Sequence, residues 1–187
     1  MKDNVVYEVK YGTKLFFYMN SEASEPTFYT VLQRRLHWLV IVLLTLQFAL
    51  QQPMQNALAE IERNEPLGFI EFLVTTVHTW GGISIALIMV WRWMLRRREV
   101  PLNGGCLPRT LERLVKMHHV SLYVVVIAMA GSGAMHYYAG VQAAARWHEL
   151  GKWLLLALIG VHVAGAAIHA FQGHTVLQRM MGRGSLR

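Results

Sequence analysis

The sequence predicts an all-α protein, a bundle of four transmembrane helices, and three observations support this prediction. Hydrophobic residues make up 54% of the 187-residue chain and charged residues only 16%, whereas soluble proteins are typically about 45–50% apolar. Four apolar segments approach the length of roughly 20 residues that a membrane-spanning helix needs. The basic residues behind the net charge of +7 flank these segments, which favours a lipid surface over nucleic acid as the partner.

The four apolar segments give the predicted spans in order, as residues 36–52, 67–95, 119–138 and 147–171. The first is the shortest and is expected to end at Pro53, because proline breaks the interior of a helix. Residues 1–33 have a mixed composition and form a predicted N-terminal cytoplasmic arm. Residues 34–183 form the predicted membrane domain.

The distribution of lysine and arginine predicts how the bundle is oriented. Fifteen of these residues lie beside the two termini or in the link between the second and third spans. The other side has only Arg63, Arg146 and Lys152. Cytoplasmic loops of membrane proteins are enriched in lysine and arginine. We therefore expect both termini in the cytoplasm and the chain in the inner (cytoplasmic) membrane of a bacterium.

Several function classes are disfavoured by the sequence. Cys106 is the one cysteine, so the chain cannot form an internal disulfide, and no C-x-x-C-H motif for covalent haem attachment occurs. The first 30 residues contain no apolar core of a signal peptide, so none is expected to be cleaved.

Seven of the nine histidines lie in or at the ends of the predicted spans, where ionisable groups are costly and usually functional, and four of them match in depth. His148 and His162 are 14 residues apart on the fourth span, which corresponds to about 21 Å along a helix and to within about 40° of one face. In depth, His37 of the first span matches His162, and His78 of the second span matches His148. The sequence thus predicts two bis-histidine sites stacked across the bilayer.

Glycines favour haem over a bare metal ion at these sites. Gly81, Gly151 and Gly165 each follow one of the histidines by three residues, and positions i and i+3 share a helix face. A glycine at that position leaves space beside the imidazole for a porphyrin. An iron with two axial histidines has no open position, so it would transfer electrons rather than bind oxygen.

Two further histidines are candidates for a quinone or proton site near the cytoplasmic surface. His169 follows His162 by seven residues on nearly the same face, and His119 opens the third span at the same level. From position alone, His169 is also an alternative to His162 as the haem ligand.

Several stretches of the chain resemble the bacterial cytochrome b561 family over roughly residues 30–183. They are Arg35-Leu36-His37-Trp38, the segment from His78 to Arg92, Trp147-His148-Glu149, Ile159-Gly160-Val161-His162 and Leu177-Gln178-Arg179-Met180-Met181. The resemblance implies a four-helix bundle that holds two b haems, with His37, His78, His148 and His162 as axial ligands. It also implies exchange of electrons with membrane quinone, and some members of the family take these electrons from superoxide on the outer side.

The chain departs from those superoxide-oxidising members in two ways. Its outer link between the third and fourth spans, about residues 139–146, is short, and its outer face has more acidic residues than basic ones. We therefore keep three functions open: a di-haem cytochrome that reduces quinone, with superoxide oxidation as one version of it, a membrane-anchor subunit of a larger dehydrogenase or hydrogenase, and a histidine-lined metal transporter. The electron donor is either superoxide or a partner redox subunit.

Overall fold

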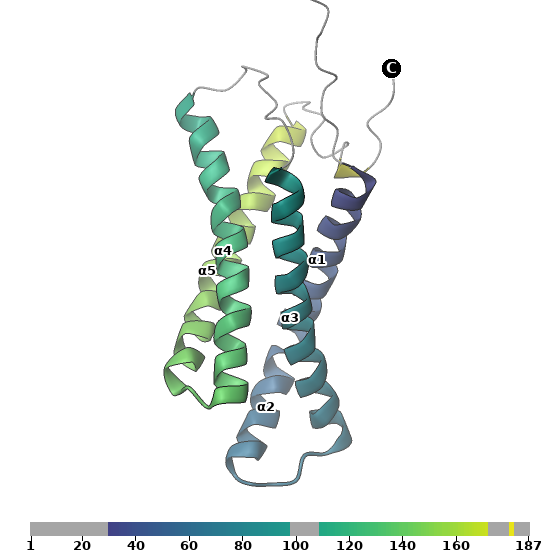
Figure 1. Ribbon diagram of the computed structural model, residues 1–187, viewed down its shortest axis with the longest axis vertical. Coiled ribbons are helices and arrows are strands. Elements are labelled where there is room, and N and C mark those ends of the chain that lie inside the picture. Colours follow the sequence, from purple (N-terminus) through teal and green to yellow (C-terminus); the bar gives the residue numbers. More distant parts are fainter. Residues whose placement is uncertain (1–29, 98–108, 172–179, 182–187) are drawn as a thin grey trace, which may run out of the picture.

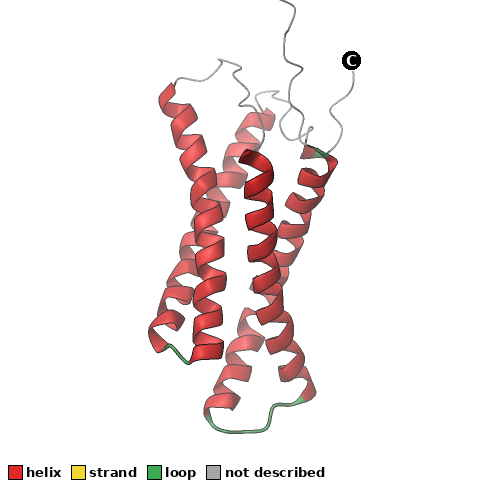
Figure 2. Ribbon diagram, viewed as in Figure 1, coloured by secondary structure: helices red, strands yellow, loops and turns green. Residues whose placement is uncertain are grey.

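The computed structural model describes residues 30–97, 109–171 and 180–181. These residues form five helices and no strand (Figures 1 and 2). The helices are α1 (Val31–Ala49), α2 (Gln51–Glu62), α3 (Phe69–Arg97), α4 (Arg109–Ala139) and α5 (Gln142–Phe171). All but α2 are long and apolar enough to cross a membrane. The prediction of an all-α fold with four membrane spans is therefore confirmed.

Helix α1 begins five residues before the predicted span because Thr30 forms a capping box with Gln33. The Thr30 hydroxyl accepts a hydrogen bond from the Gln33 backbone, and the Gln33 side chain accepts one from the Thr30 backbone, so two otherwise unpaired N–H groups at the helix start are satisfied. The remainder of the predicted arm, residues 1–29, lies outside the described residues.

The prediction that the helix stops at Pro53 is wrong. Helix α1 ends four residues earlier, at Ala49, and Leu50 joins it directly to α2, which the sequence analysis did not predict. Pro53 lies in the first turn of α2, where a backbone N–H has no partner within the helix and proline is tolerated. Proline therefore contributes to the start of a second short helix here, rather than to an open loop.

The third and fourth spans also begin earlier than predicted, at Arg109 and Gln142. The first turns of α4 are polar, and an ion pair one turn apart, with 2.6 Å between Lys116 Nζ and Glu112 Oε1, stabilises them. A pattern search for apolar residues does not detect such a polar helical extension. Cys106, in the link before α4, lies outside the described residues.

A two-residue turn joins α4 to α5. Gly140 has a positive φ of 65°, a conformation that glycine adopts without steric cost. Its N–H donates to the carbonyl of His136, which is the αL arrangement of a helix end, and the N–H of Val141 donates to that of Met135. This turn sets α4 and α5 side by side and antiparallel.

The buried core lies midway along the bundle. It draws on all four long helices and consists of Val40, Ile85, Met89, Tyr123, Val126 and Leu155. The outer surface of the helices is also apolar, and Phe69, Leu87 and Trp147 are 80%, 67% and 69% exposed. An apolar exterior of this extent is expected where lipid surrounds the helices.

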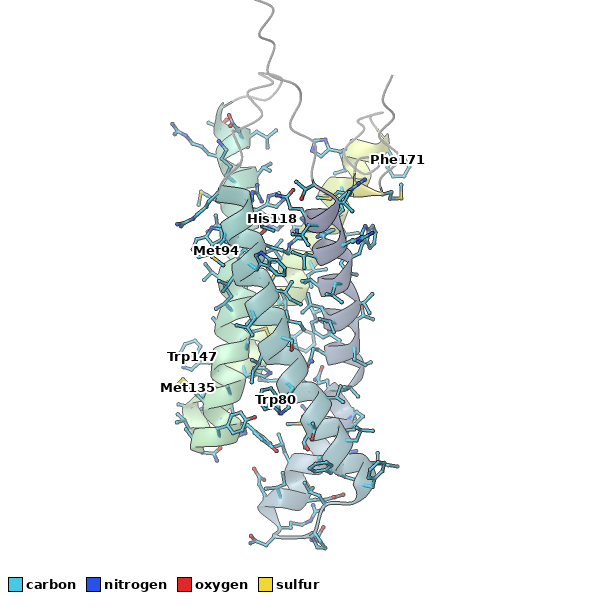
Figure 3. All side chains as sticks on the ribbon, turned by 45° about the vertical axis from the view of Figure 1, so that its right-hand side comes forward. Trp80, Met94, His118, Met135, Trp147 and Phe171 are labelled. Atoms are coloured by element: carbon cyan, nitrogen blue, oxygen red, sulfur yellow. The ribbon has the colours of Figure 1, made fainter. Side chains whose placement is uncertain are left out.

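The two ends of the bundle are named by their chain connections. At the terminal end α1 begins and α5 ends, and the Trp38 indole N–H donates to the carbonyl of Met180, 3.2 Å away. At the hairpin end α4 turns into α5, and α2 extends beyond that turn (Figure 1). Figure 3 shows His118 and Phe171 toward the terminal end, and Trp147 and Met135 toward the hairpin end.

Candidate functional site

At the hairpin end the structure places His78 of α3 and His148 of α5 close together. Their ring centroids are 6.3 Å apart and their planes meet at 70°. Nδ1 of His148 lies 2.9 Å from the carbonyl oxygen of Met129 on α4. A proton on Nδ1 therefore donates to that carbonyl and fixes the ring, and metal-binding histidines usually donate one ring nitrogen in this way. A buried nitrogen of His78, Nδ1, has no hydrogen-bond partner among the described residues.

These two histidines line a cavity of about 460 Å³, within the usual range of ligand pockets, about 300–1,000 Å³. Its wall is mostly apolar and includes small residues of α3 and α4, namely Gly82, Ala130, Gly133 and Ala134. Helix α2 contributes Met54 and Leu58 to the same wall. The unpredicted helix thus closes one side of the site.

Charged residues of α5 lie beside this cavity. Arg146 and Lys152 both line it. The side chain of Lys152 is only 10% exposed and forms an ion pair with Glu149, which is 51% exposed. Arg146 is exposed. An anionic group in the cavity, such as a carboxylate, would therefore find two cations within the same wall.

At the terminal end three imidazoles lie around that of His162 on α5. The centroid of its ring lies 6.2 Å from that of His37, 5.9 Å from that of His118 and 5.4 Å from that of His119. Nδ1 of His119 is 2.7 Å from the carbonyl of Val115, one turn back in α4. His169 lies on α5 as well, seven residues closer to the terminal end than His162.

An arginine of α3 donates a hydrogen bond to the start of α1 at the terminal end. Nη1 of Arg92, near the end of α3, donates to the carbonyl of Gln33 at 2.8 Å. On α3 the guanidinium of Arg97 also lies 4.4 Å from the centroid of the Trp93 ring, a cation–π contact. These cations keep the terminal end of the bundle positively charged within the described residues.

Outside the spans, the loop at the hairpin end contains an exposed ion pair. Arg63 Nη2 donates to Glu65 Oε2 at 3.0 Å, and this hydrogen bond lowers the pKa of the Glu65 carboxyl. Both side chains are exposed. The negative charge of Glu65 is therefore paired with the positive charge of Arg63 within the loop.

The spacing of the histidine pairs fits a haem iron between two imidazoles. A metal–imidazole bond of about 2 Å on each side, with the ring radius added, gives roughly 6 Å between ring centroids. The measured separations are 6.2 Å for His37 with His162 and 6.3 Å for His78 with His148. Among the described residues no three His, Cys, Asp or Glu side chains are arranged to hold a bare metal ion. The geometry thus favours a haem between two imidazoles over a bare metal ion held by three or more side chains. It gives no support to a metal transporter.

The three glycines predicted to flank a porphyrin have different surroundings. A Cβ at Gly81 would meet the side chain of Gln47 on α1, and one at Gly151 would lie 2.9 Å from Met129 Cγ on α4. Close helix packing alone accounts for these two glycines. At Gly165 a Cβ would meet no atom within 4 Å, so Gly165 retains the open space that the haem hypothesis requires.

Gly133 of α4 is a site residue that the sequence analysis missed. A Cβ there would lie 3.0 Å from Cε1 of His148, so glycine allows the imidazole to occupy its place. Lys152 and the α2 residues of the cavity wall were not assigned to the site either. Gly133 and His148 are on different helices, 15 residues apart, and no local sequence signal connects them.

The fold and the paired histidines together define a class, that of multi-pass helical membrane proteins with buried sites for a redox cofactor. A family model described as prokaryotic cytochrome b561 matches residues 29–183. The chain belongs to this family. It is therefore a bacterial membrane cytochrome of the b type that takes part in electron transfer. No individual curated protein matches the chain.

Proposed function

We propose that this protein is a di-haem cytochrome b of the cytoplasmic membrane that transfers electrons across the bilayer and reduces quinone. His78 and His148 would hold the outer haem at the hairpin end. His37 and His162 would hold the inner haem at the terminal end, with both chain termini in the cytoplasm. The observation that supports this most strongly is the pair of ring separations, 6.2 Å and 6.3 Å, at two levels of one bundle.

Each haem, when bound through two imidazoles, supplies an iron that gains and loses one electron and has no free position for oxygen. The residues of the chain fix where this happens. The carbonyl of Met129 orients His148, and Leu155 lies seven residues from each of the two α5 histidines, at about 10 Å along the helix. The side chain of Leu155 is 2% exposed, so it separates the two sites with apolar material.

The quinone site is proposed at the terminal end, around His169 and His119. Both rings are only partly buried; His169 is on the same helix as His162, and the ring of His119 lies 5.4 Å from that of His162. An imidazole N–H can donate to a quinone oxygen, and a protonated imidazole can supply a proton when quinone is reduced.

The test is a reduced-minus-oxidised spectrum of the purified chain together with haem quantified per polypeptide. Two low-spin b haems per chain, reoxidised on addition of quinone to vesicles that contain the protein, are the expected result. A single haem would remove one of the histidine pairs. Two haems that quinone does not reoxidise would leave the di-haem core intact but contradict the proposed acceptor.

A second candidate is the oxidation of superoxide at the hairpin end. Arg146 supports it, because this exposed cation lines the same cavity as His78 and His148 and attracts small anions. Superoxide-dependent formation of quinol by the isolated protein, lost in Arg146→Glu and retained in Arg63→Glu, would support this function. If both variants retain superoxide-dependent quinol formation, the donor site lies elsewhere.

A further inference from the structure

His118 is a half-buried imidazole to which neither the predicted haem ligation nor the proposed quinone site assigns a role. It lies on α4 at the terminal end (Figure 3). Its Nε2 is shielded from solvent and has no hydrogen-bond partner among the described residues. Such a nitrogen costs free energy when buried, so its position calls for a partner that binds to it.

The ring of His118 is as well placed toward His162 as the ring of His37 is. The centroid separations from His162 are 5.9 Å for His118 and 6.2 Å for His37. Both are near the roughly 6 Å expected when one metal lies between two imidazoles. The orientations differ, since the plane of His118 makes an angle of 17° with that of His162, and the plane of His37 makes 68°.

The third neighbour of His162 is held differently. Nδ1 of His119 lies 2.7 Å from the Val115 carbonyl, and its ring is nearer to His162, at 5.4 Å. At the hairpin end, by contrast, ring contacts among the described residues join His148 to one imidazole, that of His78. His136 lines that cavity, and its buried Nδ1 also has no hydrogen-bond partner among the described residues, but no ring contact joins it to His78 or His148. His162 therefore has more imidazoles in ring contact than one haem would use, whereas His148 has one.

We infer that His118 is a reserve axial ligand of the inner haem, able to bind the iron opposite His162 when His37 is not bound. This inference rests on the proposed di-haem function. In the exchange, the bond between the iron and the His37 nitrogen breaks and a bond to Nε2 of His118 forms. His118 then carries its proton on Nδ1. The oxidation state of the iron does not change, and one neutral imidazole replaces another.

The experiment compares His37→Ala with the double variants His37→Ala/His118→Ala and His37→Ala/His119→Ala, with His78→Ala as the hairpin-end control. For each purified full-length protein, we would measure haem per chain, carbon monoxide binding to the reduced form and the electron paramagnetic resonance spectrum of the oxidised form. Carbon monoxide binds only where an axial ligand is missing. The resonance spectrum reports the angle between the two imidazole planes.

We expect His37→Ala to keep two low-spin haems and to bind almost no carbon monoxide. Its inner-haem resonance should change to the type seen with nearly parallel imidazoles. The variant that also lacks His118 should bind about one equivalent of carbon monoxide or lose one haem, whereas the variant that also lacks His119 should behave like His37→Ala. His78→Ala should bind about one equivalent or lose one haem, because no other imidazole among the described residues is in ring contact with His148.

The inference is overturned if His37→Ala alone binds one equivalent of carbon monoxide or loses one haem. It is also overturned if removal of His119, rather than His118, abolishes the low-spin state. If His37→Ala is not recovered as folded protein, His37→Gln supports the same comparison with a side chain of similar size. His162→Ala separates the two proposals: if it retains all the haem of the unchanged protein, the inner site itself is wrong, whereas loss of one haem leaves only the reserve role in question.

Discussion

The two ends of the bundle hold histidines in different ways. At the hairpin end, one pair faces a cavity, and the Met129 carbonyl fixes one of its rings. At the terminal end, three imidazoles surround His162 at 5.4–6.2 Å. Since an iron accepts two axial ligands, the ring contacts at the hairpin end match what one haem uses and those at the terminal end exceed it. The difference indicates one end built for a fixed geometry and another that has room for ligand exchange and for proton-carrying groups.

The largest expected effect is the loss of one haem when His148 is removed. In His148→Ala, haem per chain should fall from about two to about one, because no other imidazole among the described residues is in ring contact with His78. Haem quantified against protein concentration checks this. A ratio that stays at two would show that the hairpin end, too, has a substitute ligand and would break the contrast between the ends.

A smaller but substantial effect is expected at Gly133. A methyl group at this position would lie 3.0 Å from the His148 ring, so Gly133→Ala should displace the imidazole and weaken retention of the outer haem by about tenfold, in line with other changes beside a ligand. Gly131→Ala is the matched control, since a Cβ there meets no atom within 4 Å. Equal haem retention in the two variants would contradict this role of Gly133.

Lys152 should affect the potential of the outer haem rather than its retention. A charge roughly 10 Å away at an effective dielectric constant of about 20 changes an energy by about 1.7 kcal/mol, which is tens of millivolts for one electron. Lys152→Met should therefore lower the midpoint potential of the outer haem, because a cation that favours the reduced form is lost. Glu149→Gln should raise it. A redox titration resolves both, and shifts confined to the inner haem would place Lys152 outside the site.

The smallest expected effect concerns the terminal end. Trp38→Phe removes the exposed hydrogen bond to Met180, which contributes at most about 1 kcal/mol. The melting temperature, followed by the haem absorbance, should fall by a few degrees or less, and both haem spectra should be unchanged. A changed inner-haem spectrum would mean that this contact positions His37, the neighbour of Trp38 in the chain.

Much of the fold was predictable from the sequence, because a membrane span is recognisable as a continuous segment of apolar residues. The four long helices and the two levels of histidines follow from hydropathy and from the helical rise. The polar start of α4 and the helix α2 did not follow, since tertiary contacts and the first-turn tolerance of Pro53 determine them. Of the site, the pairing of rings was predictable from depth. The neighbours of those rings, such as Gly133 and His118, depend on how the helices are rotated about their axes, and no local pattern in the chain encodes that rotation.

The apolar core between the two histidine levels has a consequence for energy conversion. The histidines of α5 lie 14 residues apart, so about 21 Å of a hydrocarbon layer roughly 30 Å thick separates their levels. A charge that crosses this layer does work of about 2.3 kcal/mol per 100 mV over the full thickness, or about 1.6 kcal/mol over this part of it. Residues such as Val40, Ile85 and Leu155 offer no polar group to carry a proton alongside the electron. Turnover of the proposed cytochrome would therefore respond to the membrane potential: an electron that moves inward carries negative charge to the cytoplasmic side, adds to an inside-negative voltage and is slowed by it.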